Sequence, residues 1–329
     1  MVTRDSAPFH ADIARAPDGT EAQWLRAEDG VRLRVGCCMA GRRGTVLLFP
    51  GRTEYVEKYG PTMAALERSG LSVAAIDWRG QGLADRIAPD PLSGHVDAFG
   101  DYQRDVAAMV ALGRAEGWPE PWHLLAHSMG GAIGLRALLQ GLPVARAAFS
   151  APMWGISIAP PLRPFARAVS WMGIASGRGH AIAPLTSRRP YADIAPFAMN
   201  LLTGDEETFD WLADQTRTHP ELALAGPSLG WLGAALRECR ALAREPSPDV
   251  PALCLLGSRE HIVDRKAVTR RMAEWPGGRL IAVEGGRHEV LMETPPRREM
   301  ALFEIAAHFD GATRADPART DRYPAPSGI

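Results

Sequence analysis

Short apolar runs recur along the chain between longer stretches that have the character of helices. Each run is five to seven residues long and lacks strict alternation of apolar and polar positions. Runs of this kind are typical of strands buried on both faces, as in a parallel sheet covered by helices. The predicted core strands are Thr45–Phe49, Ser72–Trp78, Trp122–Ala126, Arg146–Ser150, Ala252–Leu256 and Arg279–Val283.

The stretches between these runs carry helix start and stop signals. Asp101 is a good N-cap, and Gly70 and Gly117 suit the position just after a helix. The predicted helices span 61–69, 102–117 and 129–141. Ahead of them, two strands at 23–28 and 32–39 are joined at Asp29–Gly30, a strong hairpin signal. Strand–helix alternation of this kind predicts a doubly wound, mostly parallel α/β fold.

The alternation of strands and helices is interrupted once, over residues 152–248, and is not found at either end of the chain. Residues 152–248 are rich in proline and contain helix-like segments at 205–215 and 229–243 but no convincing strand. We interpret this segment as a helical cap inserted over the carboxyl edge of the sheet, where ligands bind in such folds. The α/β core then comprises 21–151 and 249–310. Residues 1–20 are expected to be poorly ordered and the polar tail 311–329 disordered.

The chemistry centres on Ser128. The strand Trp122–Ala126 leads into His127-Ser128-Met129-Gly130-Gly131, and a helix follows. This is the nucleophile elbow, G-x-S-x-G, with Ala126 in place of the first glycine. Small residues are needed on both sides of the serine because the tight turn packs the strand against the helix. The turn exposes the serine hydroxyl at a helix N-terminus, where backbone N–H groups stabilise developing negative charge.

A serine nucleophile needs a base, and the base needs an acid to orient it. In this fold the chain order is serine, acid, histidine. His288 follows the last core strand and is the candidate base. Two carboxylates, Glu260 and Asp264, follow the strand before it and compete for the role of the acid. Glu260 stands nearer the end of its strand, whereas Asp264 precedes a helix-like run, where it suits an N-cap.

The same fold predicts the oxyanion hole. One donor is the N–H of the residue after the nucleophile, Met129. The other comes from the loop after Thr45–Phe49, in which the Arg52 N–H is the candidate.

Composition excludes several other classes of protein. Net charge is −1 over 329 residues, with no concentrated basic segment, so nucleic acid is not an expected partner. The four cysteines show no metal-binding spacing, and we expect reduced thiols, no metal and no cofactor. The amino terminus lacks an apolar secretory segment, and no stretch is long and apolar enough to span a bilayer. We therefore expect a cytoplasmic protein, with peripheral contact at the inner face of the membrane left open.

The assembled motifs resemble the monoacylglycerol lipase and lysophospholipase L2 branch of the α/β-hydrolase superfamily, whose members include serine aminopeptidase S33-type hydrolases. Gln81 in Arg79–Gly82 points toward the lysophospholipase L2 side. The resembling stretches are Phe49–Tyr59, Ala75–Arg86, Gly94–Tyr102, Leu124–Gly131, Leu255–Asp264 and Gly285–Glu293.

The resemblance implies nucleophile Ser128, base His288 and acid Glu260, with Arg52 and Met129 as the oxyanion donors. It also implies that Glu54 helps to shape the head-group end of the pocket. The chain departs from the family pattern at Ala126 and at Pro50, but neither change removes a catalytic group.

The resemblance further implies a small-molecule lipid ester as substrate, a lysophospholipid first and a monoacylglycerol next. Different chemistry on the same fold remains an alternative: an esterase, thioesterase or peptidase acting on a non-lipid substrate. A non-catalytic binding protein is the third hypothesis, against which the intact serine, acid and histidine argue. The bulky apolar residues of 152–248 suit an acyl tunnel, but the insertion's own core explains most of them.

Overall fold

The computed structural model describes residues 5–184, 186–190 and 195–311. The strands of these residues form one nine-stranded sheet, ordered β1-β2-β3-β5-β4-β6-β7-β8-β9. The strands from β1 to β5 along this order pair antiparallel, and the remaining pairs are parallel. The bounds are β1 Ser6–Ala7, β2 Glu21–Arg26, β3 Arg32–Cys38, β4 Thr45–Phe49, β5 Ser72–Asp77, β6 Trp122–His127, β7 Arg146–Ser150, β8 Ala252–Gly257 and β9 Arg279–Val283. The predicted α/β-hydrolase fold is confirmed.

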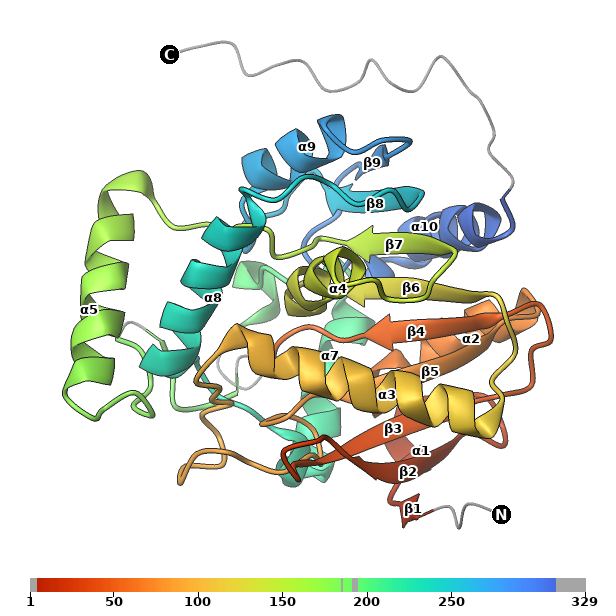
Figure 1. Cartoon of the computed structure of the whole chain (residues 1–329), viewed down its shortest axis with the longest axis horizontal. Helices are drawn as coiled ribbons and strands as arrows, with labels where there is room; N and C mark the ends of the chain where they lie inside the picture. The colour runs from red at the N-terminus through yellow and green to blue at the C-terminus, as the bar shows by residue number, and fades with distance from the viewer. Residues whose placement is uncertain (1–4, 185, 191–194, 312–329) are drawn as a thin grey trace.

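Helices cover both faces of this sheet because alternate residues of each central strand point to opposite sides. On β4, Leu47 and Phe49 join the core of one face, and Val46 and Leu48 join the core of the other. Figure 1 shows α3 and α4 in front of the sheet, with α2 and α10 behind it. The bounds are α2 Gly60–Arg68, α3 Tyr102–Glu116, α4 Met129–Leu139, α9 Arg265–Ala273 and α10 Pro295–Phe309.

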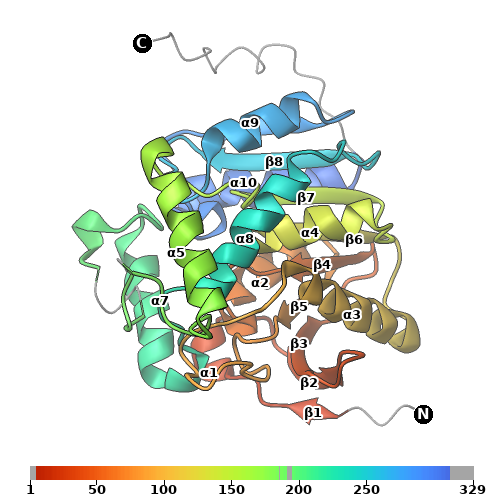
Figure 2. The ribbon, with the colours of Figure 1, turned by 60° about the vertical axis from the view of Figure 1, so that its left-hand side comes forward.

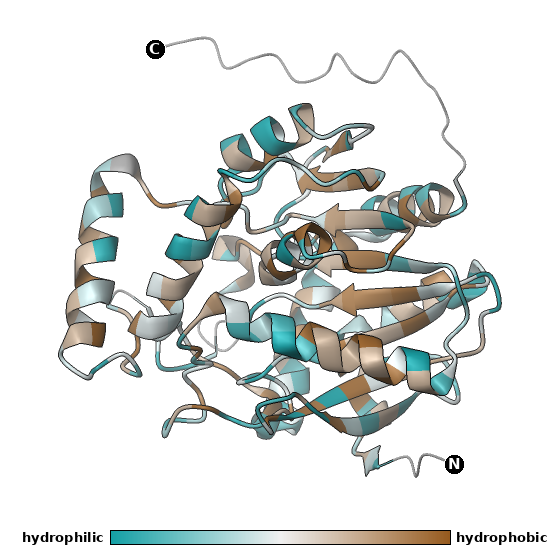
Figure 3. Cartoon of the chain, in the orientation of Figure 1, coloured by the Kyte–Doolittle hydropathy of each residue, from teal (hydrophilic) through white to brown (hydrophobic). Residues whose placement is uncertain are grey.

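Hydropathy follows the same layering. Figure 3 shows β4, β6 and β7 hydrophobic over most of their length, whereas α3 mixes hydrophilic and hydrophobic residues. Every residue of β4, β6 and β8 is buried. Central strands enclosed in this way hold the loops at their carboxyl ends in fixed positions.

The segment 152–248 supplies α5 (Arg163–Ala175), α7 (Glu206–Thr218) and α8 (Leu229–Leu242). Figures 1 and 2 show α5 and α8 side by side beyond the carboxyl ends of the central strands. Described residues of the segment pack into the cores on both faces of the sheet. Trp231 of α8 belongs to the core on one face of the sheet, and Trp211 of α7 belongs to the core on the other.

Helix α5 lies in the proline-rich stretch in which the sequence indicated no helix. Its one proline, Pro164, does not interrupt it, because Pro164 falls in the first turn, where a backbone N–H has no intrahelical partner to lose. Several apolar side chains of this helix are exposed, with Phe165 60% and Trp171 70% accessible.

The expectation of a poorly ordered segment 1–20 is wrong for the part that is described, residues 5–20. Ser6–Ala7 pairs with β2, and Ala11–Ala14 forms helix α1. The Ile13 carbonyl accepts hydrogen bonds from Trp211 Nε1 (3.0 Å) and Gln215 Nε2 (2.9 Å) of α7. The sequence did not reveal this arrangement, because the residues of α7 that hold the segment in place lie about 200 positions further along the chain. Of the predicted tail, 312–329 lies outside the described residues.

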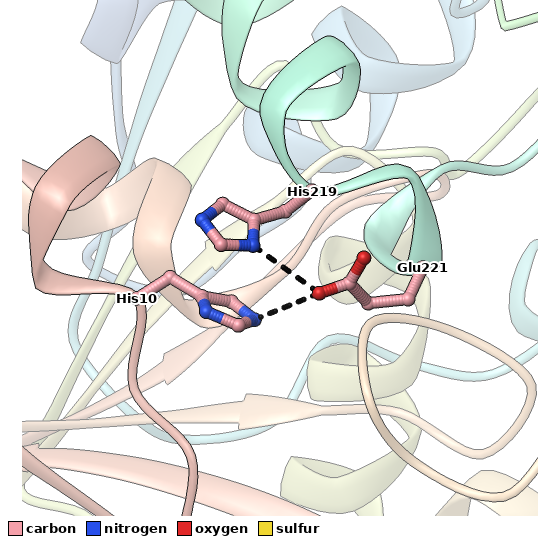
Figure 4. Close-up of side chains that lie close together, drawn as sticks. All are labelled: His10, His219 and Glu221. Carbon is pink, nitrogen blue, oxygen red and sulfur yellow. Dashed lines mark hydrogen bonds and ion pairs between the residues drawn. The ribbon is translucent and has the colours of Figure 1, made fainter.

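A cluster of polar side chains lies at the surface, where the amino-terminal segment meets the end of α7 (Figure 4). His10 Nε2 and His219 Nδ1 lie 3.3 and 3.2 Å from the same oxygen of Glu221, and His219 Nε2 lies 3.0 Å from Asp12 Oδ2. The two imidazoles stack with centroids 3.7 Å apart. The cluster therefore joins the amino-terminal segment to the turn after α7, and we call it the His219 clasp.

Candidate active site

Ser128 occupies a strained turn between β6 and α4. Its φ of 49° and ψ of −117° are unusual for a residue with a side chain, and such strain is typical of functional positions. A Cβ at Gly130 would collide with the Phe49 carbonyl, and one at Gly131 with Pro152. Ala126 is tolerated before the serine because it faces Gly134, whose missing side chain leaves room for the methyl group. The space for the methyl group of Ala126, where the family pattern has glycine, therefore comes from Gly134 of α4.

Three buried side chains from separate elements meet at this turn. His288 Nε2 lies 2.9 Å from Ser128 Oγ, and His288 Nδ1 lies 2.7 Å from Glu260 Oε2. The other Glu260 oxygen accepts hydrogen bonds from the Ile262 and Val263 N–H groups. Burial alone would raise the pKa of the Glu260 carboxyl, but the facing His288 and these N–H groups hold it below its ordinary value. An ionised carboxylate at Nδ1 leaves Nε2 as the acceptor for the serine proton.

Asp264 takes no part in this chain of hydrogen bonds. It is the N-cap of α9, where its Oδ1 accepts from the N–H groups of Lys266 and Ala267. Its Oδ2 lies 2.9 Å from Arg163 at the start of α5. Of the two candidate acids, the geometry brings Glu260 to His288 and commits Asp264 to a helix end.

The two candidate oxyanion donors, Arg52 and Met129, both line the same cavity as Ser128. Neither backbone N–H donates a hydrogen bond within the described residues. The loop that carries Arg52 is held by Gln81, which donates to the Gly51 carbonyl (2.9 Å) and accepts from the Thr53 N–H (3.2 Å). The sequence marked Gln81 only as a family signature, and its bracing contacts depend on how two distant loops meet.

Glu54 lines the cavity, but its carboxylate is already engaged. It accepts hydrogen bonds from the Gly51 N–H, the Tyr59 hydroxyl and, at 2.7 Å, the Lys58 ammonium. These contacts make it a brace of the oxyanion loop. Its direct contact with a substrate head group stays a prediction.

Lys58 links this brace to the histidine loop. Its ammonium lies 2.7 Å from Glu54 Oε1 and 2.7 Å from Glu289 Oε1. Glu289 directly follows the candidate base, His288, in the chain. His127 lies 3.3 Å from the other oxygen of Glu289. Burial opposes charge on His127, but the two carboxylates outweigh it and raise its pKa above the ordinary value. Glu54, Lys58, Glu289 and His127 therefore form a buried network of close contacts that ties both loops together.

Two groups within the described residues have the spacing of metal ligands. In the first, Glu54, His127 and Glu289, the Lys58 ammonium already bridges the carboxylates, so the cation there is a lysine. The second is His10, His219 and Glu221 of the His219 clasp, in which a nitrogen of each imidazole already lies within 3.3 Å of one Glu221 oxygen. The structure therefore adds no support for a metal in either place.

A second serine–histidine–aspartate arrangement lies nearby and differs in exposure. His95 Nδ1 lies 2.7 Å from Ser228 Oγ, and His95 Nε2 lies 3.0 Å from Asp97. Ser228 is fully buried and accepts a hydrogen bond from the Trp231 N–H as the N-cap of α8. Its hydroxyl cannot meet a substrate, so this arrangement is structural.

The cavity beside Ser128 has a volume of about 810 Å³, within the range of small-molecule sites. Charged groups gather at the end near the oxyanion loop, and aliphatic and aromatic side chains form most of the remaining wall. The apolar lining includes Ile156, Ile158, Leu162, Phe165, Val169, Leu202, Leu212, Leu224, Leu229 and Leu232. Several of these residues come from 152–248, so this segment contributes to the cavity as well as to the core.

The parallel sheet, the strained serine turn and the hydrogen-bonded Ser128–His288–Glu260 chain define a serine hydrolase of the α/β-hydrolase fold. Residues 40–295 match the family model described as Serine aminopeptidase, S33. The chain belongs to this family.

Relatives agree with this assignment. Lysophospholipase L2 of Escherichia coli (strain K12) is 32% identical over 287 residues, which cover 80% of each chain. Probable lysophospholipase L2 of Haemophilus influenzae is 30% identical over 269 residues, covering 81% of this chain and 83% of that one. Among solved structures, monoglyceride lipase from Saccharomyces cerevisiae superposes with a TM-score of 0.70 at 20% identity, covering 93% of this chain and 99% of that one. At 20% identity, this structural likeness shows a shared fold and nothing more.

Proposed function

We propose that this carboxylic ester hydrolase is a lysophospholipase that releases a fatty acid through an acyl-enzyme intermediate. The observation that carries the proposal is the hydrogen-bonded chain from Ser128 through His288 to Glu260, which opens onto a largely apolar cavity. A buried apolar cavity of this kind suits an acyl chain. The two relatives named as lysophospholipases support the choice of substrate.

Each residue has one role in the proposed mechanism. Ser128 Oγ attacks the ester carbonyl carbon while His288 Nε2 takes the hydroxyl proton. The Arg52 and Met129 N–H groups stabilise the oxyanion, and Glu260 holds His288 in the required tautomer and balances its positive charge. The ester C–O bond then breaks, and His288 gives its proton to the departing glycerol oxygen. Water, deprotonated by His288, attacks the acyl-enzyme and releases the fatty acid.

A substrate panel tests the proposal. Lysophosphatidylcholine, lysophosphatidylethanolamine, monoacylglycerol and short p-nitrophenyl esters should be compared with the matching thioesters and amides. We expect kcat/KM to be highest for a long-chain lysophospholipid. Faster cleavage of amides would favour a peptidase, in line with the family's name. Failure of Ser128 to react with a fluorophosphonate probe would point to a binding protein.

We also propose peripheral contact with the inner face of a membrane. Within the described part of the chain, no helix is long and apolar enough to cross a bilayer. Leu162 and Phe165 line the cavity and are also more than half exposed, so the cavity wall continues into an apolar surface on α5. The four free thiols are in keeping with a cytoplasmic location. Co-sedimentation with phospholipid vesicles, lost in Trp171→Glu, would support this contact; equal binding by both proteins would refute it.

A further inference from the structure

The side chain of Arg52 contacts an aromatic ring and two backbone carbonyls at the wall of the cavity. Its guanidinium lies over the Trp231 ring, 5.1 Å from the centroid, and donates hydrogen bonds to the carbonyls of Ala225 (2.9 Å) and Ser93 (3.3 Å). Its Nε has almost no contact with solvent and no hydrogen-bond partner. Arg52, Ala225 and Trp231 all line the cavity beside Ser128. Arg52 is therefore a residue of the cavity wall, and its Nε is enclosed by protein.

No carboxylate among the described residues lies within ion-pair distance of this guanidinium. By contrast, Arg34 pairs with Asp77 and Glu57, and the neighbouring carboxylates raise its pKa despite burial. For Arg52, burial lowers the pKa to about 10, which still leaves the group charged at neutral pH. A half-buried cation without a counter-ion among the described residues is less well stabilised than a paired one, and an anionic ligand would supply that partner.

The other charges of the cavity wall do not supply this counter-ion. Glu54 and Glu289 are already engaged by the Lys58 ammonium and lie beside His127 within the buried network. Among the described residues, Arg52 is thus a cation of the lining without a carboxylate partner, and its backbone also supplies a candidate oxyanion N–H. The exposed Arg189 is a second arginine in the lining.

We propose that the Arg52 guanidinium forms an anion-binding subsite for the phosphate of a lysophospholipid head group. The inference rests on the proposed function and adds a residue that selects lysophospholipids over neutral monoacylglycerols. Arginine suits this task because its planar group donates several hydrogen bonds to phosphate oxygens at once.

The length of an arginine side chain matches the distance along a lysophospholipid from its ester carbon to its phosphorus. About six covalent bonds separate the backbone nitrogen of an arginine from its guanidinium carbon, and about six separate the ester carbon of a lysophospholipid from its phosphorus. An arginine side chain is thus long enough to extend to the phosphate of a lysophospholipid while its own N–H faces the oxyanion.

The test compares two substrates with the same acyl chain, lysophosphatidylcholine and monoacylglycerol, below their micellar concentrations. The readout is the ratio of their kcat/KM values, because loss of Arg52 is expected to affect the oxyanion loop for both. In Arg52→Gln, the ratio should fall about 10- to 100-fold, the usual effect of losing a charged hydrogen bond. Arg52→Lys should restore part of it. Arg114→Gln, the same change at an exposed position of α3, should keep the wild-type ratio.

A binding measurement keeps the proposal testable if Arg52→Gln folds poorly. Hydrolysis of a short p-nitrophenyl ester by the wild type should be inhibited more strongly by glycerophosphocholine than by glycerol. Inorganic phosphate as a third inhibitor distinguishes a general anion site from one that needs the glycerol backbone. Equal inhibition by glycerophosphocholine and glycerol, or an unchanged substrate ratio in Arg52→Gln, would overturn the subsite. If the wild type hydrolyses neither lipid, the proposed function itself is wrong.

Discussion

Glu260 Oε2 lies 2.7 Å from Nδ1 of His288, although a glutamate is one methylene longer than an aspartate in the same role. The extra methylene is accommodated because Glu260 turns back to accept the N–H groups of Ile262 and Val263 from its own loop. The carboxylate is thereby fixed before it meets the imidazole.

Glu260→Gln should lower kcat by about 10³- to 10⁴-fold, because the amide no longer balances the imidazolium or fixes its tautomer. Asp264→Ala should instead lower the free energy of unfolding by about 1 kcal/mol through loss of the α9 cap. Steady-state kinetics and denaturant unfolding of both variants measure these effects. The reverse pattern, with Asp264→Ala folded but inactive, would reassign the acid.

Ser128→Ala should abolish ester turnover, with a loss of at least about 10⁴-fold in kcat. The folded structure should persist, because alanine is smaller than serine and the turn keeps its glycines. Circular dichroism and the melting temperature serve as the control. Activity near the wild-type level would exclude Ser128 as the nucleophile.

Lys58→Met should lower the free energy of unfolding by about 3–5 kcal/mol, because Glu54 and Glu289 would lose the cation that both contact. Lys266→Met removes the same charge from an exposed position and should have little effect. Urea unfolding of the two variants and the wild type provides the comparison. Equal stability of both variants would show that the buried network does not depend on Lys58.

His219 should make the stability of the protein depend on pH. Hydrogen bonding to Asp12 raises the pKa of His219 above its ordinary value of 6.5. The clasp therefore stabilises the fold fully below about pH 6.5 and loses this contribution as the pH rises through the raised pKa. The difference in melting temperature between wild type and His219→Gln should be larger at pH 5.5 than at pH 9. Asp12→Asn should reduce this pH dependence; a constant difference would argue against the clasp.

Much of the core could be predicted from local patterns. Thr45–Phe49, Arg146–Ser150 and Arg279–Val283 have the predicted bounds, and the other core strands differ by a residue at one end. Continuous apolar runs reveal buried strands because burial on both faces removes the need for alternation. Helix α5 was not predicted, because Pro164 in its first turn belongs to a proline-rich stretch that resembles a loop.

The sequence by itself determined the α/β-hydrolase fold, the serine turn and the short set of candidates for base, acid and oxyanion donors, because each depends on residues adjacent in the chain. The tertiary structure alone decided the contacts of Glu260 and Asp264, the neutralisation of Glu54 by Lys58, and the absence of a described counter-ion at Arg52. It also decided the ordering of residues 5–20 against α7. These features depend on distances between side chains far apart in sequence, and only folding brings such groups together in a medium where an unpaired charge is costly.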